Sequence, residues 1–164
     1  MPAHGVLEHL AQLTNRWGAL RLNGGIMFDF VNWPATLLAT VAATFVSAVC
    51  YLPPILGQRW GSLIKHWTKQ SDADLSSNVP RRLGLWLLSY LVNAIFLAAL
   101  LFAAKVGSVA GGIGIAIVAW IAMGLTFSAW PVIHANQPVG VWVMNNAVYL
   151  LAQMVMAAIL VALK

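Results

Sequence analysis

Three long runs without a charged side chain constrain the fold of this chain more than any other feature. No Asp, Glu, Lys or Arg occurs in residues 30–58, 83–104 or 106–163. A helix needs about 20 apolar residues to cross the hydrocarbon core of a bilayer. The first two runs each fit one span, whereas the third is long enough for two. The polar cluster that ends at Pro138 marks the boundary within it, because proline is tolerated in the first turn of a helix.

The composition agrees with a membrane protein. Hydrophobic residues make up 61% of the chain and charged residues only 8%, whereas soluble domains carry about 25% charged residues. The runs are apolar on all faces, which favours helices over barrel strands of alternating polarity. The sequence therefore predicts an all-α, polytopic membrane protein. Its domain at 30–164 is a bundle of four transmembrane helices, with spans at about 34–56, 83–104, 113–133 and 139–163.

Residues 1–29 are expected to form a separate interfacial segment. Val6, Leu10, Leu13 and Trp17 recur at intervals of three and four, which is the spacing of one helix face. Polar side chains lie opposite them, so we predict an amphipathic helix in the membrane interface. A frayed polar tail is the alternative for this segment.

The loop between the first two spans predicts the orientation. Its net charge is positive, and the positive-inside rule places such a loop in the cytoplasm. Four spans then place both termini outside, in the inner membrane of a bacterium. The overall net charge of +5 could also suggest nucleic acid, but basic residues beside a membrane favour anionic lipid headgroups as the partner. The charged residues of the loop are Arg59, Lys65, Lys69, Arg81 and Arg82 against Asp72 and Asp74.

Catalytic and metal-binding patterns are missing from the sequence. The single cysteine, Cys50, excludes an internal disulfide, and the four histidines have no metal-ligand spacing. The sequence therefore predicts no catalytic set, no metal site and no cofactor. The remaining signals concern helix packing and polar groups within the spans.

Small residues form a stripe along the first span. Ala35, Ala39, Ala43 and Ser47 follow one another at steps of four, so they share one helix face. Small residues allow two helix backbones to approach closely in a membrane. The stripe predicts a close helix–helix contact.

The fourth span is the most polar of the four. Asn145, Tyr149 and Gln153 lie at steps of four, with Asn146 beside them, and Asn93 in the second span is a possible partner at a similar depth. A side-chain amide in hydrocarbon is costly unless it is paired. Two interpretations remain open: an interhelical hydrogen-bond clamp, which we favour, or a small polar pocket between spans 2 and 4.

A distinctive motif closes the first span. It consists of Tyr51, Pro54, Gly57 and Trp60. In this motif the chain resembles a family of small four-span bacterial membrane proteins classed as a domain of unknown function. The chain departs from the usual pattern at Cys50, Pro53 and Leu56, where that family typically has Trp, Ser and Phe. The resemblance implies the four-span fold over about residues 34–163 and implies no activity.

Three classes of function follow from these features. The first expectation is a non-enzymatic accessory or structural protein that forms homo-oligomers or docks on a larger membrane complex. The alternative is a carrier that binds a small molecule or a lipid in the polar pocket. A membrane enzyme that acts on lipid through His134 or Asp29 is the most distant alternative, because neither residue has a positioned nucleophile beside it.

Overall fold

The structure, a computed structural model, describes residues 31–69, 71 and 79–164, and these residues contain helices but no strand. Four of the helices are long and apolar enough to cross a membrane. The all-helical, multi-pass fold predicted from the charge-free runs is therefore confirmed. The interfacial helix predicted for residues 1–29 and the acidic part of the basic loop lie outside the described residues.

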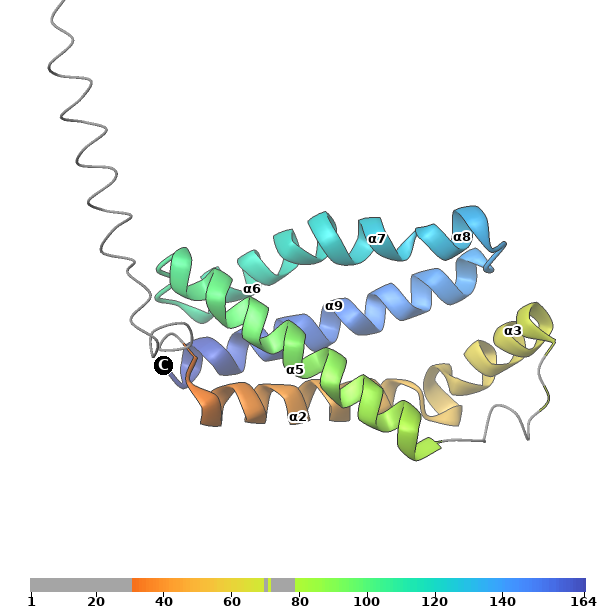
Figure 1. The fold of residues 1–164 in the computed structure, drawn as a ribbon, viewed down its shortest axis with the longest axis horizontal. Coiled ribbons are helices and arrows are strands. Elements are labelled where there is room, and N and C mark those ends of the chain that lie inside the picture. Colours follow the sequence, from red (N-terminus) through yellow and green to blue (C-terminus); the bar gives the residue numbers. More distant parts are fainter. Residues whose placement is uncertain (1–30, 70, 72–78) are drawn as a thin grey trace, which may run out of the picture. The chain divides into compact units, whose positions relative to one another are not determined.

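The elements follow one another in an up-and-down order (Figure 1). The first span is α2, the second is α5, the third runs over Val109–His134, and the fourth is α9. The turn η2 and the short helix α3 connect the first two spans. The bounds are α2 Trp33–Cys50, η2 Pro53–Gly57, α3 Gln58–Thr68, α5 Val79–Ala103, α6 Val109–Ala119, η3 Trp120–Leu125, α7 Thr126–Ser128, α8 Trp130–His134 and α9 Val139–Ala162.

The first span ends at Cys50, earlier than the predicted residue 56. Pro53 and Pro54 follow after two residues, and they lack the backbone N–H groups that would continue the helix. The chain turns at Tyr51 and Leu52 and then forms η2. The other three spans begin and end within a few residues of the predicted positions.

Helix α2 satisfies its own polar groups. The Asn32 side chain caps its N-terminus by accepting a hydrogen bond from the Ala35 N–H at 3.2 Å. Thr36, Thr40 and Thr44 each donate a hydroxyl hydrogen bond to the carbonyl four residues earlier. This back-bonding lets threonine face an apolar interior without a partner on another helix.

Helix α9 lies at the centre of the bundle. It packs against α2 on one side and α6 on another, and α2 also packs against α5. All four residues of the small-residue stripe on α2 are buried within the chain. The close helix contact that the stripe predicts is therefore made inside one chain. The buried apolar core consists of Ala35, Ala39, Ala43, Tyr90, Ala94, Leu97, Ala98, Leu101, Ala116, Ala152, Met156, Ala157, Leu160 and Val161.

The two ends of the bundle are built differently. At the end that carries α3, which we call the α3 end, α3 packs onto α9 and its Ile64 is buried, and the Trp67 indole donates to the Ala135 carbonyl at 2.8 Å. At the opposite end the Asn32 side-chain amide donates to the Leu163 carbonyl at 2.6 Å, and Lys164 donates to the Val106 carbonyl. Polar side chains therefore tie the chain together beyond both ends of the spans.

The third span is interrupted in its middle by η3. This segment is a π-helix, in which the ladder is widened by one residue. The Thr126 hydroxyl donates to the Ile121 carbonyl five residues earlier, at 2.9 Å, which fits the widened turn. Such wide turns in membrane helices often accompany functional sites. Here η3 contributes Gly124 to the cavity described below.

Candidate functional site

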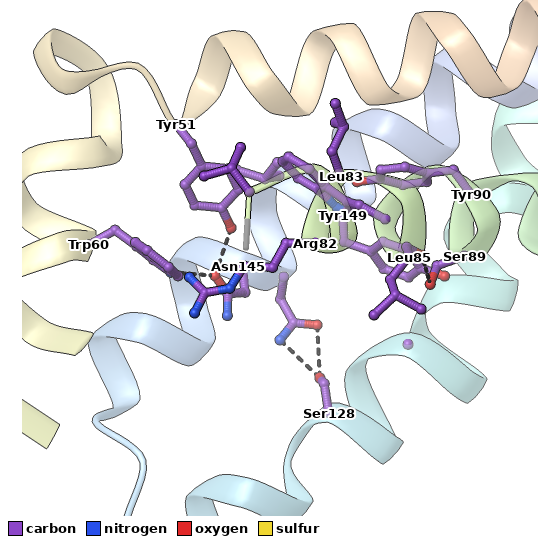
Figure 2. A pocket seen from close by; sticks show the side chains of 15 residues that line it. Tyr51, Trp60, Arg82, Leu83, Leu85, Ser89, Tyr90, Ser128, Asn145 and Tyr149 are labelled. Atoms are coloured by element: carbon purple, nitrogen blue, oxygen red, sulfur yellow. Dashed lines mark hydrogen bonds between the residues drawn. The ribbon is translucent and has the colours of Figure 1, made fainter. Parts of the chain in front are cut away.

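A cavity of about 830 Å³ lies in the α3 half of the bundle. We call it the aromatic cavity. Its walls come from the N-terminal half of α5, from η3 and α7, and from α9, while Tyr51 lines it from the turn after α2 and Trp60 from the start of α3 (Figure 2). Helix α5 has few contacts with the third span, so the two walls stand apart. The lining residues are Tyr51, Trp60, Val79, Arg82, Leu83, Leu85, Trp86, Ser89, Tyr90, Gly124, Ser128, Asn145, Asn146, Val148 and Tyr149.

Five aromatic rings form a continuous chain along the cavity. Tyr51 meets Trp60 edge-on at a centroid distance of 5.5 Å and Trp86 at 6.0 Å. Trp86 contacts Tyr90 at 6.1 Å, and Tyr90 stacks on Tyr149 at 6.3 Å. These separations are typical of favourable aromatic pairs. The rings give the cavity a wide apolar wall that runs from the α3 end towards the middle of the bundle.

Asn145 holds two of these rings. Its side-chain carbonyl Oδ1 accepts one hydrogen bond from the Tyr51 hydroxyl at 2.6 Å and another from the Trp60 indole Nε1 at 2.9 Å. Two donors on one oxygen fix which way the amide is turned, because its amino group cannot accept them. The Nδ2 amino group makes no hydrogen bond within the described residues, and Asn145 lines the cavity.

The turn η2 explains how Tyr51 and Trp60 reach the same acceptor. The Gly57 N–H donates to the Leu52 carbonyl at 3.1 Å, which closes the wide turn. A Cβ atom at residue 57 would overlap the Tyr51 carbonyl oxygen, so the turn requires glycine here. The four motif residues therefore cooperate. Proline and glycine shape the turn, and the two aromatic residues donate to Asn145.

Asn146 makes a second polar contact, between α9 and the third span. Its amide lies 2.9 Å from the Ser128 hydroxyl and donates to the Trp142 carbonyl at 2.9 Å. The Trp142 indole donates to the same hydroxyl at 3.1 Å. Asn146 is buried, and its polar atoms are used within the protein. Asn146 therefore links α9 to the third span, whereas from the sequence we expected its partner on the second span.

A third polar pair lies deeper, between α5 and α9. The Gln153 amide donates to the Asn93 side-chain carbonyl at 3.2 Å. The remaining atoms, Gln153 Oε1 and Asn93 Nδ2, are buried and have no partner within the described residues, and neither has the indole nitrogen of Trp120. The Ser47 hydroxyl lies 2.5 Å from the Tyr90 hydroxyl and links α2 to α5.

The structure divides the polar cluster that the sequence predicted. Asn145, Asn146 and Tyr149 line the aromatic cavity, whereas Asn93 and Gln153 pair with each other outside its lining. Three residues of the cluster therefore border a cavity and two form an interhelical hydrogen bond, and the choice between a ligand pocket and a packing clamp stays a prediction.

The sequence reasoning missed the wall that α5 supplies. Arg82, Trp86 and Tyr90 stand at steps of four on this helix and all line the cavity. The spacing of three amphipathic side chains on one face was the available signal. From the sequence, Arg82 was assigned only to the basic loop.

The residues considered for an enzyme lie elsewhere. His134 is exposed at the end of α8, and its ring lies against the Trp130 ring at a centroid distance of 3.8 Å. It is not among the residues that line the cavity, and Asp29 lies outside the described residues. Within the described ranges, the structure shows no cluster of three or more His, Cys, Asp or Glu side chains that could hold a metal ion.

Comparison with known proteins identifies the family. The model of the family described as "Protein of unknown function (DUF1761)" matches residues 34–161. The chain belongs to this family, and the resemblance noted from the sequence is confirmed. The matched range covers all four spans and the η2 turn. Comparisons with curated proteins and with solved structures find no match.

Proposed function

We propose that this protein binds an amphipathic small molecule or a lipid in the aromatic cavity. The observation that carries the proposal is a cavity of about 830 Å³ with five aromatic rings along its wall and with Arg82 and Asn145 at one end. Ligand sites in proteins are typically cavities of about 300–1,000 Å³ with mostly apolar walls and a few placed polar groups. The alternative that ranked second from the sequence is therefore placed first.

The distribution of polarity along the cavity supports an amphipathic ligand. Arg82, Asn145 and Trp60 lie at the α3 end, whereas Tyr90 and Tyr149 lie towards the middle of the bundle (Figure 2). A ligand with a polar head and an apolar tail would match this order. Leu83 and Leu85 on the α5 lip are exposed, which is compatible with entry from the apolar phase of the membrane.

The orientation of the protein is part of the same proposal. We place the α3 end in the cytoplasm of a bacterium and the four spans in its inner membrane, because the basic residues gather at this end. The basic residues of α3 would then meet anionic lipid headgroups. The polar end of the cavity would open near the inner leaflet.

Filling the cavity is the direct test. Ser89 is exposed and lines the cavity, whereas its neighbour Leu88 is exposed but does not line it. We expect Ser89→Phe to remove most of the thermal stabilisation that dodecyl phosphate gives to delipidated protein, and Leu88→Phe to leave it unchanged. Equal stabilisation of both variants and the parent chain would exclude the cavity as the binding site.

A role as an accessory protein is the second candidate, supported by the exposed side of the third span. Phe127 is 73% exposed, Trp130 66% and Ile133 68%. The small-residue stripe is buried within the chain. A homo-oligomer or a contact with a larger complex would therefore need another surface, such as the exposed side of the third span. Cysteine crosslinking between copies at Phe127 in native membranes, with Val92 on α5 as the control position, tests this candidate.

A further inference from the structure

We infer that the ligand of the aromatic cavity carries an anionic, hydrogen-bond-accepting headgroup, a phosphate or a carboxylate, which binds between Arg82 and the amide nitrogen of Asn145. The inference rests on the proposed function and specifies the class of ligand. Nothing in the family description assigns a ligand to these residues.

The Asn145 side chain presents its Nδ2 amino group to the cavity, because its Oδ1 oxygen already accepts two hydrogen bonds. Tyr51 and Trp60 both donate to Oδ1. Turning the amide over would leave both donors facing an amino group, and both hydrogen bonds would be lost. The amino group that remains can only donate, so it selects an acceptor on the ligand.

Arg82 supplies the charge. It is the one charged side chain among the described residues that line the cavity, and none of these described residues is acidic. Its guanidinium lies at the same end of the cavity as Trp60 and Asn145 (Figure 2). A planar guanidinium matches the paired oxygens of phosphate and carboxylate groups.

The aromatic wall by itself is compatible with a ligand of the opposite charge. Aromatic faces attract cations, and rings of this kind form cages for ammonium groups. Two features disfavour a cation at the polar end, namely the positive charge of Arg82 and the donor-only amino group of Asn145. The rings would instead cover the apolar part of an anionic molecule.

The experiment compares three probes that share one apolar tail. Protein in nanodiscs of phosphatidylcholine is titrated with dodecyl phosphate, dodecyltrimethylammonium and dodecanol, and binding is followed by thermal stabilisation. We expect dodecyl phosphate to bind at least about tenfold more tightly than the other two, because hydrogen bonds to a charged group contribute about 1.5–3 kcal/mol.

Two variants assign the headgroup contacts. Arg82→Gln should weaken the binding of dodecyl phosphate by about tenfold or more, whereas Arg81→Gln, which changes an exposed neighbour outside the cavity, should leave it within about twofold. Asn145→Asp keeps an acceptor for Tyr51 and Trp60 but presents a second oxygen to the cavity. It should therefore weaken the phosphate probe more than dodecanol.

Two further titrations identify the source of the headgroup. Loss of dodecyl phosphate binding when phosphatidylglycerol replaces phosphatidylcholine in the nanodisc would assign the site to a membrane phospholipid. Binding of inorganic phosphate as tight as that of dodecyl phosphate would support the anion site but overturn the amphipathic ligand of the proposed function.

The failure of the inference differs from the failure of the proposed function. Equal binding of the three amphiphiles, with Ser89→Phe still blocking all of them, would overturn the anionic headgroup and keep the cavity as the binding site. Equal losses in Arg82→Gln and Arg81→Gln would also overturn it. Absence of binding by every amphiphile would overturn both proposals.

Discussion

The same four helices pack differently in the two halves of this bundle. In the half away from α3, small residues face one another, and the large side chains Leu97, Leu101 and Met156 are fully buried among them. Gly112 lies against Val161 and the Ala157 carbonyl, so that even one added carbon would collide there. In the α3 half, large aromatic residues face one another and the helices border an open cavity.

The difference shows that the size of the facing residues decides how closely two helices approach. Helices in a bilayer gain little from burying apolar surface, so they associate through close packing and polar contacts. Alanine and glycine let the backbones meet and leave no space. Tyr51, Trp86 and Tyr149 hold the helices apart, and they are kept in place by hydrogen bonds and ring contacts rather than by close backbone approach. One half thus provides stability, and the other provides space.

The largest effect is expected from breaking the close contact of the first half. Ala39 is fully buried on α2, and Ala39→Leu should lower the free energy of unfolding by about 3 kcal/mol, because the larger side chain forces the backbones apart. Reversible unfolding in bicelles measures this change. Val41→Leu, on the lipid-facing side of the same helix, is the control and should change stability little. Equal effects of both variants would mean that α2 does not pack through its small residues.

A smaller effect on stability, but a large effect on the cavity, is expected at the η2 turn. Gly57→Ala places a methyl group against the Tyr51 carbonyl and should destabilise the protein by about 2 kcal/mol. It should also separate Tyr51 and Trp60 from Asn145, which the tryptophan emission spectrum and amphiphile binding would report. Gly61→Ala in α3 meets open space and is the matched control. A normal cavity in Gly57→Ala would contradict the role given to this turn.

The same contrast explains what the sequence could and could not predict. Periodicity and the lack of charge determine where apolar helices lie, and the steps of four on α2 identify its buried face. The cavity depends on which helices diverge, and that depends on contacts between residues far apart in the chain, such as Trp60 with Asn145. A motif read from the sequence showed that Tyr51, Gly57 and Trp60 belong together. It could not show that their common partner lies on the fourth span.

The smallest effect is expected where the two halves meet, at the pair Asn93 and Gln153. The pair makes one hydrogen bond and leaves one buried amide oxygen and one buried amino group without partners among the described residues. Removing one member leaves the other fully unpaired, so Gln153→Leu alone should lower stability by about 1 kcal/mol.

Replacing both members removes the hydrogen bond together with the desolvation cost of all four polar groups. The double variant Asn93→Leu, Gln153→Leu should therefore be as stable as the parent chain or slightly more stable. A double-mutant cycle of unfolding free energies measures the difference between the pair and its members. If the double variant is instead clearly less stable than the parent chain, the two atoms without a partner among the described residues are hydrogen-bonded in the folded membrane protein. The boundary between the halves would then be a separate polar site, because the lost stability would come from hydrogen bonds to partners outside the described residues.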